Sequence, residues 1–298
     1  MLSFLFYRQI GEACSFLVEW SIMRDNAIEV VGKIGSMALI RDNELDIDYN
    51  VFSRVAKELK PGMLWVSSGA VEIGRLDYIK RMGCELDGPK SDVMTDYSAQ
   101  GQAILMEEYR RYIPAKYSVR QLLVEHTHFN HPEKREHICN FFLRCASQNA
   151  IPIINYNDTV SFEENRRWEL NQLRCNGKKD VVECIDNDET AATIACLVRA
   201  KNLIIFTSAK GIYLDPKDPS TLVERVEGKN ADEVIAAITE LQKSCIGVSR
   251  EGAGGAKAKL EFIKEPVRAG SKVMIASAKY RISEVLSGKC PQTLFQVR

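Results

Sequence analysis

The 298-residue sequence predicts an α/β protein, a three-layer α/β/α sandwich with a mainly parallel central sheet. Short apolar runs rich in Val and Ile alternate along the chain with longer segments of helical spacing. Such alternation is typical of right-handed strand–helix–strand units. The hydrophobic content of 45% and the charged content of 27% are ordinary for a globular protein with a sizeable core.

The apolar runs are expected to form buried strands at residues 28–31, 63–66, 119–124, 151–154, 203–206 and 273–276. Helical spacing predicts helices at residues 45–59, 98–112, 137–149, 189–200 and 231–241. The polar segment 161–185 contains Asn176-Gly177, a dipeptide typical of hairpin turns. We therefore expect a projecting hairpin there, with strands at 168–174 and 180–184.

We divide the chain into an N-terminal extension, residues 1–25, and one domain over residues 26–298. The extension is apolar in patches, but Arg8, Glu12 and Glu19 interrupt it. This pattern predicts an amphipathic helix that packs on the body or on a partner subunit, rather than a membrane span or a signal peptide. Alternatively, the ancestral start lies at Met23 and the extension is incidental.

The charge balance and the cysteine content indicate which partners and which cell compartment to expect. The 40 Lys and Arg residues balance the 40 Asp and Glu residues, so no dedicated nucleic-acid surface is expected. A membrane partner is not expected either. The nine cysteines are odd in number and contain no Cys-x-x-Cys pair, which indicates mostly buried thiols in a reducing compartment. We therefore expect a cytoplasmic protein.

Polar side chains crowd the end of the expected strand at residues 151–154, namely Asn155, Asn157, Asp158 and Thr159. In an open α/β sheet, ligands bind at the carboxyl ends of the strands. The alternative interpretation is an Asn/Asp turn that bonds only its own backbone. A second cluster, Asp186-Asn187-Asp188, precedes a helix and exceeds what an N-cap needs. Two such clusters favour a binding site.

Three further turns are suited to bind anions. Gly32–Ser36 contains Lys33, Ser67-Ser68-Gly69 opens a helix, and Gly252–Gly255 precedes Lys257 and Lys259. Backbone N–H groups and ammonium groups in such turns bind phosphate. Taken singly, each turn is also explained as a glycine turn with a solvated lysine, an N-cap or a flexible loop. Their repetition at successive strand ends favours phosphoryl transfer, which needs neutralising charges around the transferring group.

All four histidines lie between residues 126 and 137, at positions 126, 128, 131 and 137. The cluster raises the hypothesis of a metal site. However, Pro132 interrupts the segment, and the spacing suits neither a helical zinc pair nor a zinc finger. We favour a polar loop and expect no metal site formed by the protein's own side chains.

Five motifs together resemble the amino-acid kinase family, and its glutamate 5-kinase (gamma-glutamyl kinase) branch most closely. They are Lys-Ile-Gly-Ser at 33–36, Val-Ser-Ser-Gly-Ala-Val at 66–71, Asn-Tyr-Asn-Asp-Thr-Val at 155–160, Asp-Asn-Asp at 186–188 and Gly-Ala-Gly-Gly…Lys at 252–259. The motifs occur in the family's order, and the resemblance runs from about Val30 to about Phe295. The RNA-modification-type (PUA) domain that is common in this branch is not expected here.

The resemblance implies an activity and a set of roles. The activity would be ATP-dependent phosphorylation of the side-chain carboxylate of L-glutamate to gamma-glutamyl phosphate, the first step of proline biosynthesis. Lys33 and Lys259 would stabilise the transferring phosphoryl group, and Asp188 would hold both ammonium groups. The substrate-binding residues would be Ser68, Gly69, Asn155, Asp158, Asp186 and Asn187. The nucleotide-binding residues would be Gly35, Ser36, Thr207, Ser208, Lys210, Gly211, Gly252, Gly254 and Gly255.

The resemblance also implies that residues 26–200 bind the acceptor and residues 201–298 the nucleotide, in a homo-oligomer, dimer or tetramer. Mg²⁺ would arrive with ATP on phosphate oxygens. Because the acceptor is already a carboxylate, no general base is needed. Two alternatives stay open: a kinase of the same fold for another small carboxylate or phosphate acceptor, and a non-catalytic regulator that binds an amino acid or a nucleotide.

Overall fold

The computed structural model describes residues 27–41, 43–161, 163–178, 181–184, 186–215, 217–244 and 255–298. The expected N-terminal helix at residues 1–25 lies outside these residues. An eight-stranded sheet has the order β5-β6-β4-β1-β7-β9-β10-β8. Its strands are β1 (Val30–Ile34), β4 (Met63–Ser67), β5 (Ser118–Val124), β6 (Ala150–Tyr156), β7 (Asn202–Thr207), β8 (Arg225–Gly228), β9 (Lys272–Ser277) and β10 (Gln292–Val297). Its strand pairs are parallel except for β9 with β10.

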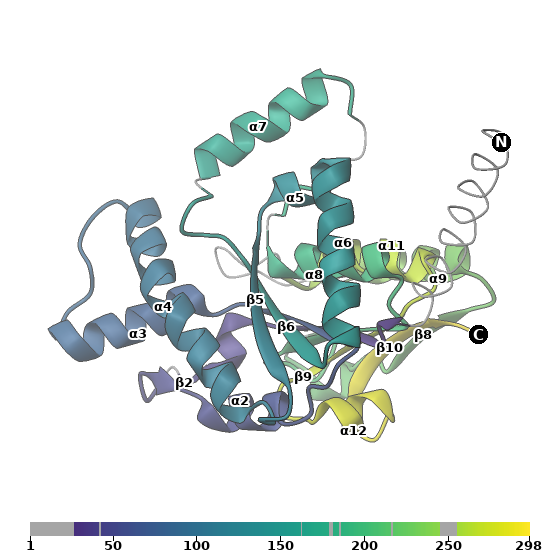
Figure 1. The fold of residues 1–298 in the computed structure, drawn as a ribbon. Coiled ribbons are helices and arrows are strands. Elements are labelled where there is room, and N and C mark those ends of the chain that lie inside the picture. The colour runs from purple at the N-terminus through teal and green to yellow at the C-terminus, as the bar shows by residue number, and fades with distance from the viewer. Residues whose placement is uncertain are drawn as a thin grey trace, which may run out of the picture.

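Helices cover both faces of the sheet, as the sequence predicts. One face carries α2 (Tyr49–Ala56), α3 (Ala70–Met82), α4 (Lys90–Tyr112) and α12 (Ile282–Leu286). The other face carries α5 (His126–Asn130), α6 (Pro132–Ser147), α8 (Asn187–Val198), α9 (Ala231–Ser244), α10 (Gly255–Phe262) and α11 (Lys264–Arg268). In Figure 1, α6, α8, α9 and α11 lie above the sheet, and α2 and α12 lie below it. The three-layer α/β/α prediction is confirmed.

Strand β1 occupies the centre of the sheet and divides it into two halves. Strands β4, β6 and β5 extend the sheet on one side of β1, and β7, β9, β10 and β8 extend it on the other. The connections therefore reverse direction at β1, and open α/β sheets bind ligands at such a switch point. Side chains along a strand point alternately to the two faces of the sheet. That of Lys33, near the carboxyl end of β1, points to the face that α8 covers, where it meets Asp188.

Close contacts at two places in the fold depend on glycine. A Cβ atom at Gly32 would lie 2.0 Å from the ring of Trp65 on β4. Where α3 crosses α4, a Cβ atom at Gly74 would lie 1.8 Å from the carbonyl oxygen of Tyr97, and one at Gly101 would lie equally close to the carbonyl oxygen of Ala70. The close crossing brings the first half of α4 against the segment that follows β4.

The expected hairpin at residues 161–185 is wrong. Residues Glu163–Cys175 form helix α7, which projects beyond the sheet above α5 in Figure 1. Asn176-Gly177 ends this helix instead of joining two strands. Gly177 has a φ of 82°, the N–H of Lys178 donates to the carbonyl of Leu173 at 3.1 Å, and the N–H of Gly177 donates to Arg174 at 3.0 Å. These two bonds define a Schellman cap, in which glycine takes the same left-handed backbone that hairpin turns use.

The expected polar loop around the histidines is also wrong. His126 and His128 belong to α5, His131 is the N-cap of α6, and His137 lies within α6. Pro132 occupies the first turn of α6, where its missing N–H leaves no bond unmade. The described residues contain no group of three or more His, Cys, Asp or Glu side chains placed to hold a metal ion.

Other boundaries shift by a few residues. Helix α4 begins at Lys90, well before the expected start. Helix α2 begins at Tyr49, because Asp46–Ile47 form a short strand, β3, which pairs with Ile40–Arg41 of strand β2. No disulfide joins the described cysteines, and four of them are buried: Cys139, Cys145, Cys184 and Cys290. None of the described helices combines the length and the apolar character that crossing a membrane requires.

Candidate active site

Asp188 lies between two lysine ammonium groups near the carboxyl end of β1. Its Oδ1 is 2.7 Å from Nζ of Lys33, and its Oδ2 is 2.7 Å from Nζ of Lys259. The three side chains come from β1, the first turn of α8 and the middle of α10. They are well shielded from solvent, with exposed fractions of 2% for Asp188, 8% for Lys33 and 18% for Lys259. We call these three residues the charged centre.

The charged centre keeps its carboxylate ionised. Burial alone would raise the pKa of Asp188, but the ammonium groups of Lys33 and Lys259 outweigh burial and lower it below the usual value. With both lysines charged, the centre carries a net charge of about +1 in a water-poor environment. Such a group attracts anions, and it stabilises negative charge that develops on a transferring phosphoryl group.

Asp186 organises the start of α8. Its Oδ1 accepts hydrogen bonds from the backbone N–H groups of Asp188 at 2.7 Å and Glu189 at 3.0 Å. This is an N-cap, and it fixes the backbone that presents Asp188 to the lysines. Burial and the nearby charge of Asp188 raise the pKa of Asp186. Within the Asp-Asn-Asp cluster, Asp186 therefore serves as the helix cap, while Asp188 belongs to the charged centre.

A chain of hydrogen-bonded polar side chains begins at Asn187, next to Asp188 of the charged centre; Asn155 and Gln102 in it are buried, and Asn187 and Ser68 are half-buried. Nδ2 of Asn187 donates to Oγ of Ser68 at 3.1 Å and to Oδ1 of Asn155 at 2.9 Å. Nδ2 of Asn155 donates to Oε1 of Gln102 at 2.9 Å. We call Ser68, Gln102, Asn155 and Asn187 the polar network. It joins α8, the segment after β4, the end of β6 and α4.

Two atoms of the polar network lack a partner. Oδ1 of Asn187 and Nε2 of Gln102 are buried, and neither forms a hydrogen bond within the described residues. Buried polar groups are nearly always satisfied, because leaving one unpaired costs about 1–3 kcal/mol. One acceptor and one donor left open in the same network indicate a position for a polar ligand or for water.

Asp158 follows the polar network in the loop after β6. Burial raises its pKa from 3.8 to about 6, and the charge of Arg166 on α7 opposes this rise. In the described part of the chain no ion pair neutralises its carboxylate. A half-buried carboxylate that no ion pair neutralises is suited to bind a cationic group of a ligand, since that would offset the cost of its desolvation.

Six of the residues predicted to bind a nucleotide lie close to the carboxyl ends of β1 and β7 in the chain: Gly35, Ser36, Thr207, Ser208, Lys210 and Gly211. Gly35 is the N-cap of the short 3₁₀ helix Ser36–Ala38, and its N–H donates to the carbonyl of Phe206 at 3.3 Å. In the turn after β7, Oγ1 of Thr207 accepts from the N–H of Ala209 at 3.0 Å, and Ser208 and Lys210 are exposed.

Two glycines in this region have structural constraints. A Cβ atom at Gly211 would lie 2.5 Å from Oγ1 of Thr293 on β10, so glycine is required for packing there. Gly255 begins α10 with a φ of 58°, a left-handed backbone that favours glycine. Gly252 and Gly254 lie outside the described residues.

Two residues of this region, Gln102 and Arg166, are not among those predicted from the sequence. Gln102 lies within the helical pattern of α4, where nothing in the sequence marks it as different from a core or surface glutamine. Arg166 was assigned to a hairpin and not considered. Gly69, by contrast, was selected as substrate-binding, and it is the N-cap of α3 with a φ of 111°, which brings Ser68 to the carboxyl edge of the sheet.

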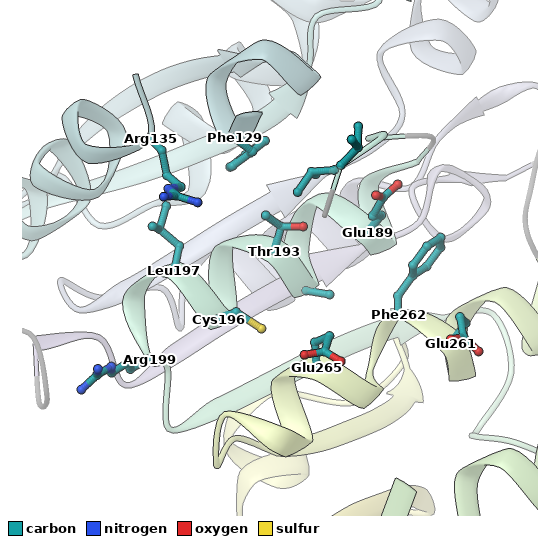
Figure 2. Close-up of a pocket in the computed structure, with 13 residues that line it drawn as sticks. Phe129, Arg135, Glu189, Thr193, Cys196, Leu197, Arg199, Glu261, Phe262 and Glu265 are labelled. Carbon is teal, nitrogen blue, oxygen red and sulfur yellow. The ribbon is translucent and has the colours of Figure 1, made fainter. Parts of the chain in front are cut away.

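A separate groove of about 830 Å³ runs along α8 on the side away from the sheet. In Figure 2, α8 forms its floor, with Phe129 and Arg135 on one side and Phe262 and Glu265 on the other. None of the residues selected from the sequence lines this groove. It is therefore distinct from the charged centre and the polar network.

Comparison with known proteins agrees with this geometry. The family model described as "Amino acid kinase family" matches residues 29–277. Glutamate 5-kinase of Ligilactobacillus salivarius is 29% identical to this chain, over 91% of this chain and 96% of the relative. Glutamate 5-kinase of Alkaliphilus metalliredigens is 30% identical, over 90% and 95% of the two chains.

Solved structures are similar in fold. Carbamate kinase from Giardia lamblia bound to AMP-PNP has a TM-score of 0.54 at 14% identity, over 92% of this chain and all of that one. UMP kinase from Ureaplasma parvum has a TM-score of 0.50 at 11% identity, over 90% and 99%. Charged centre, sheet topology and family match lead to one conclusion: the chain belongs to the amino acid kinase family.

Proposed function

We propose that this protein phosphorylates the side-chain carboxylate of L-glutamate with Mg²⁺-ATP, giving gamma-glutamyl phosphate for proline biosynthesis. The observation that carries the proposal is the charged centre. Lys33 and Lys259 lie on either side of one buried carboxylate, each 2.7 Å from it, which holds two cations where a phosphoryl group would pass. The curated glutamate 5-kinases that align over nine-tenths of the chain support the choice of acceptor.

The polar network and the two acidic residues beside it are proposed to bind the amino acid. Glutamate offers one ammonium group and two carboxylates. Asp158 and Asp186 would face the ammonium group, and the side chains of Ser68, Asn155 and Asn187, with the backbone at Gly69, would hold a carboxylate. The open Oδ1 of Asn187 and the open Nε2 of Gln102 supply one acceptor and one donor for such a ligand.

The strand ends on the other side of the charged centre are proposed to bind the nucleotide. Gly35, Ser36, Thr207, Ser208, Lys210, Gly211 and the glycines 252, 254 and 255 would contact ATP. In this proposal residues 26–200 bind the acceptor and residues 201–298 the nucleotide. Mg²⁺ would enter as part of the substrate, held mainly by phosphate oxygens.

The proposed reaction is a single in-line displacement. An oxygen of the glutamate side-chain carboxylate bonds to the γ-phosphorus of ATP, and the bond from that phosphorus to the β–γ bridging oxygen breaks. ADP leaves with the electron pair, and no proton has to move, so no general base is required. Lys33 and Lys259 would stabilise the charge on the equatorial and leaving oxygens, while Asp188 fixes both ammonium groups.

The direct test measures ADP release with Mg²⁺-ATP across a panel of amino acids and small carboxylates, with hydroxylamine present to trap an acyl phosphate. We expect a hydroxamate with L-glutamate and not with L-aspartate or L-glutamine. ADP release with another acceptor, without a hydroxamate, would mean that the protein is a kinase whose acceptor is not glutamate. No turnover with any acceptor, together with ligand-dependent thermal stabilisation, would favour a non-catalytic regulator.

A further inference from the structure

We propose that Arg166 on α7 is a positioning residue of the acceptor site, which joins the loop carrying Asp158 to the segment leading to Asp186. The inference rests on the proposed function, because that proposal assigns both carboxylates to the acceptor. Arg166 does not touch the charged centre. It acts on the two segments from which Asp158 and Asp186 project.

The first contact of Arg166 is with Tyr156. Its guanidinium carbon lies 5.7 Å from the centre of the Tyr156 ring, a cation–π distance. Tyr156 is the last residue of β6 and is 5% exposed. Its hydroxyl is 2.5 Å from Oγ of Ser161, so one side chain connects the beginning and the end of the loop that contains Asp158. The guanidinium over the ring therefore limits how this loop can shift.

The second contact is with the segment before Asp186. Nη1 of Arg166 donates to the carbonyl oxygen of Cys184 at 3.3 Å. Cys184 is buried and has a φ of 50°, an uncommon backbone for a residue other than glycine. Further bonds shape the same segment: the N–H of Val182 donates to Oδ1 of Asn130 at 3.1 Å, and the N–H of Glu183 donates to Oε1 of Glu189 at 2.9 Å. One guanidinium thus spans both segments.

The charge of Arg166 acts on the same site. Burial raises the pKa of Asp158, and Arg166 is the charged group whose field lowers it. The positive charge of Arg166 favours the ionised carboxylate of Asp158 without pairing with it, since no ion pair joins the two residues within the described part of the chain. Arg166 therefore leaves the carboxylate available for the ammonium group of an amino acid.

Helix α7 has other attachments to the body, so loss of Arg166 should not detach it. Oε2 of Glu169 lies 2.7 Å from Nε2 of His126 on α5, and Arg174 pairs with Glu183. Leu170 is 4% exposed. The half-buried Arg166 can thus be replaced while the helix remains docked.

The kinetic test compares Arg166→Ala, Arg166→Lys and the matched control Arg167→Ala, which removes the same charge from the neighbouring, exposed position of α7. For Arg166→Ala we expect the KM for glutamate to rise about tenfold and kcat and the KM for ATP to change less than threefold. The acid limb of kcat/KM for glutamate should move to higher pH. Arg166→Lys keeps the charge, so its acid limb should stay in place, and Arg167→Ala should match the parent. An unchanged KM and an unchanged acid limb in Arg166→Ala would overturn the proposal.

A second measurement does not depend on the substrate. Hydrogen–deuterium exchange of the ligand-free protein should show faster exchange in peptides covering residues 157–161 and 181–189 in Arg166→Ala, and no change in Arg167→Ala. The amides of Asn157, Ser161 and Glu183 are hydrogen-bonded in these segments and report on them. Equal exchange in parent and Arg166→Ala would contradict the positioning role. If the parent does not use glutamate, the proposed function fails, while the exchange result still decides whether Arg166 couples the two segments.

Discussion

The two sides of the charged centre present different kinds of groups. On one side the polar network presents side chains that bond one another and are shielded from solvent: Asn155 is 2% exposed, Gln102 is 9% exposed, and Ser68 and Asn187 are half-buried. On the other side the turn after β7 presents a backbone held by its own hydrogen bonds, while the side chains of Ser208 and Lys210 are exposed.

This difference predicts unequal sensitivity to substitution. A buried side chain that is bonded on several sides cannot be changed without leaving a partner unsatisfied. An exposed side chain on a self-bonded turn can be changed at little cost, because the backbone still offers its N–H groups. We therefore expect selectivity to depend on side chains on the acceptor side and on backbone geometry on the nucleotide side.

The largest effect is expected in the charged centre, which both sides share. Asp188→Ala and Lys259→Ala should each lower kcat about 10³-fold, because each removes part of the arrangement that stabilises developing charge. Asp188→Ala also leaves two lysines without their counter-charge and should reduce the free energy of unfolding by about 3 kcal/mol. Hydroxamate formation measures the first effect and urea denaturation the second. Turnover within a few-fold of the parent in either variant would remove the charged centre from the mechanism.

The next effect tests the acceptor side alone. Asp158→Asn keeps the shape of the side chain and removes its charge, so the KM for glutamate should rise about 30-fold, or about 2 kcal/mol, the value of a charge-assisted hydrogen bond. The KM for ATP should stay within twofold. Steady-state kinetics with each substrate varied in turn separates the two. An unchanged KM for glutamate would mean that the acceptor binds elsewhere.

The raised pKa of Asp158 gives a pH dependence of definite sign. Its pKa is raised from 3.8 to about 6, so the carboxylate is ionised above pH 6 and protonated below it. Only the ionised form attracts an ammonium group, so kcat/KM for glutamate should fall about tenfold per pH unit below pH 6. The measurement is a pH profile from pH 5 to 8 at saturating ATP. Asp158→Asn should lack this limb, and a limb that persists in the variant belongs to another group.

The smallest effect is expected on the nucleotide side. Ser208→Ala removes an exposed hydroxyl and should change the KM for ATP less than twofold, because the turn retains the Thr207–Ala209 bond. Its matched comparison is Asn155→Ala, which interrupts the buried network and should raise the KM for glutamate more than tenfold. If Ser208→Ala raises the KM for ATP by a larger factor than Asn155→Ala raises the KM for glutamate, the contrast between the two sides is wrong.

Much of the fold could be predicted because its signals are local. Apolar runs such as Ile151–Ile154 and Leu203–Phe206 lie within strands β6 and β7, and the residues that follow them occupy one edge of the sheet. A parallel sheet brings its carboxyl ends together, so motifs at successive strand ends were expected to converge. Lys33 and Asp188 do so.

The errors arose where one signal serves two structures. Asn176-Gly177 supplies the left-handed backbone of a hairpin turn, and here it supplies the same backbone for the cap of α7. The preceding segment Glu163–Cys175 is rich in Glu, Arg, Leu and Gln, residues with good helix propensity, and its composition outweighs the turn signal.

Gln102 could not have been selected from the sequence. A glutamine inside a long helix has no distinctive spacing, and its importance comes from the close crossing of α3 and α4 at Gly74 and Gly101. That crossing depends on tertiary packing, which no local pattern records. The same holds for Arg166, whose two contacts lie on different segments of the chain.

The most direct test of the central claim follows an oxygen atom. L-Glutamate labelled with ¹⁸O in its side-chain carboxylate is incubated with Mg²⁺-ATP, the protein and hydroxylamine, and the released phosphate is analysed by ³¹P NMR or mass spectrometry. If the carboxylate attacks the γ-phosphorus, hydroxylamine then breaks the bond between the carbonyl carbon and the labelled oxygen, and each phosphate should carry one ¹⁸O atom. Phosphate without the label would contradict acyl-phosphate formation at the charged centre.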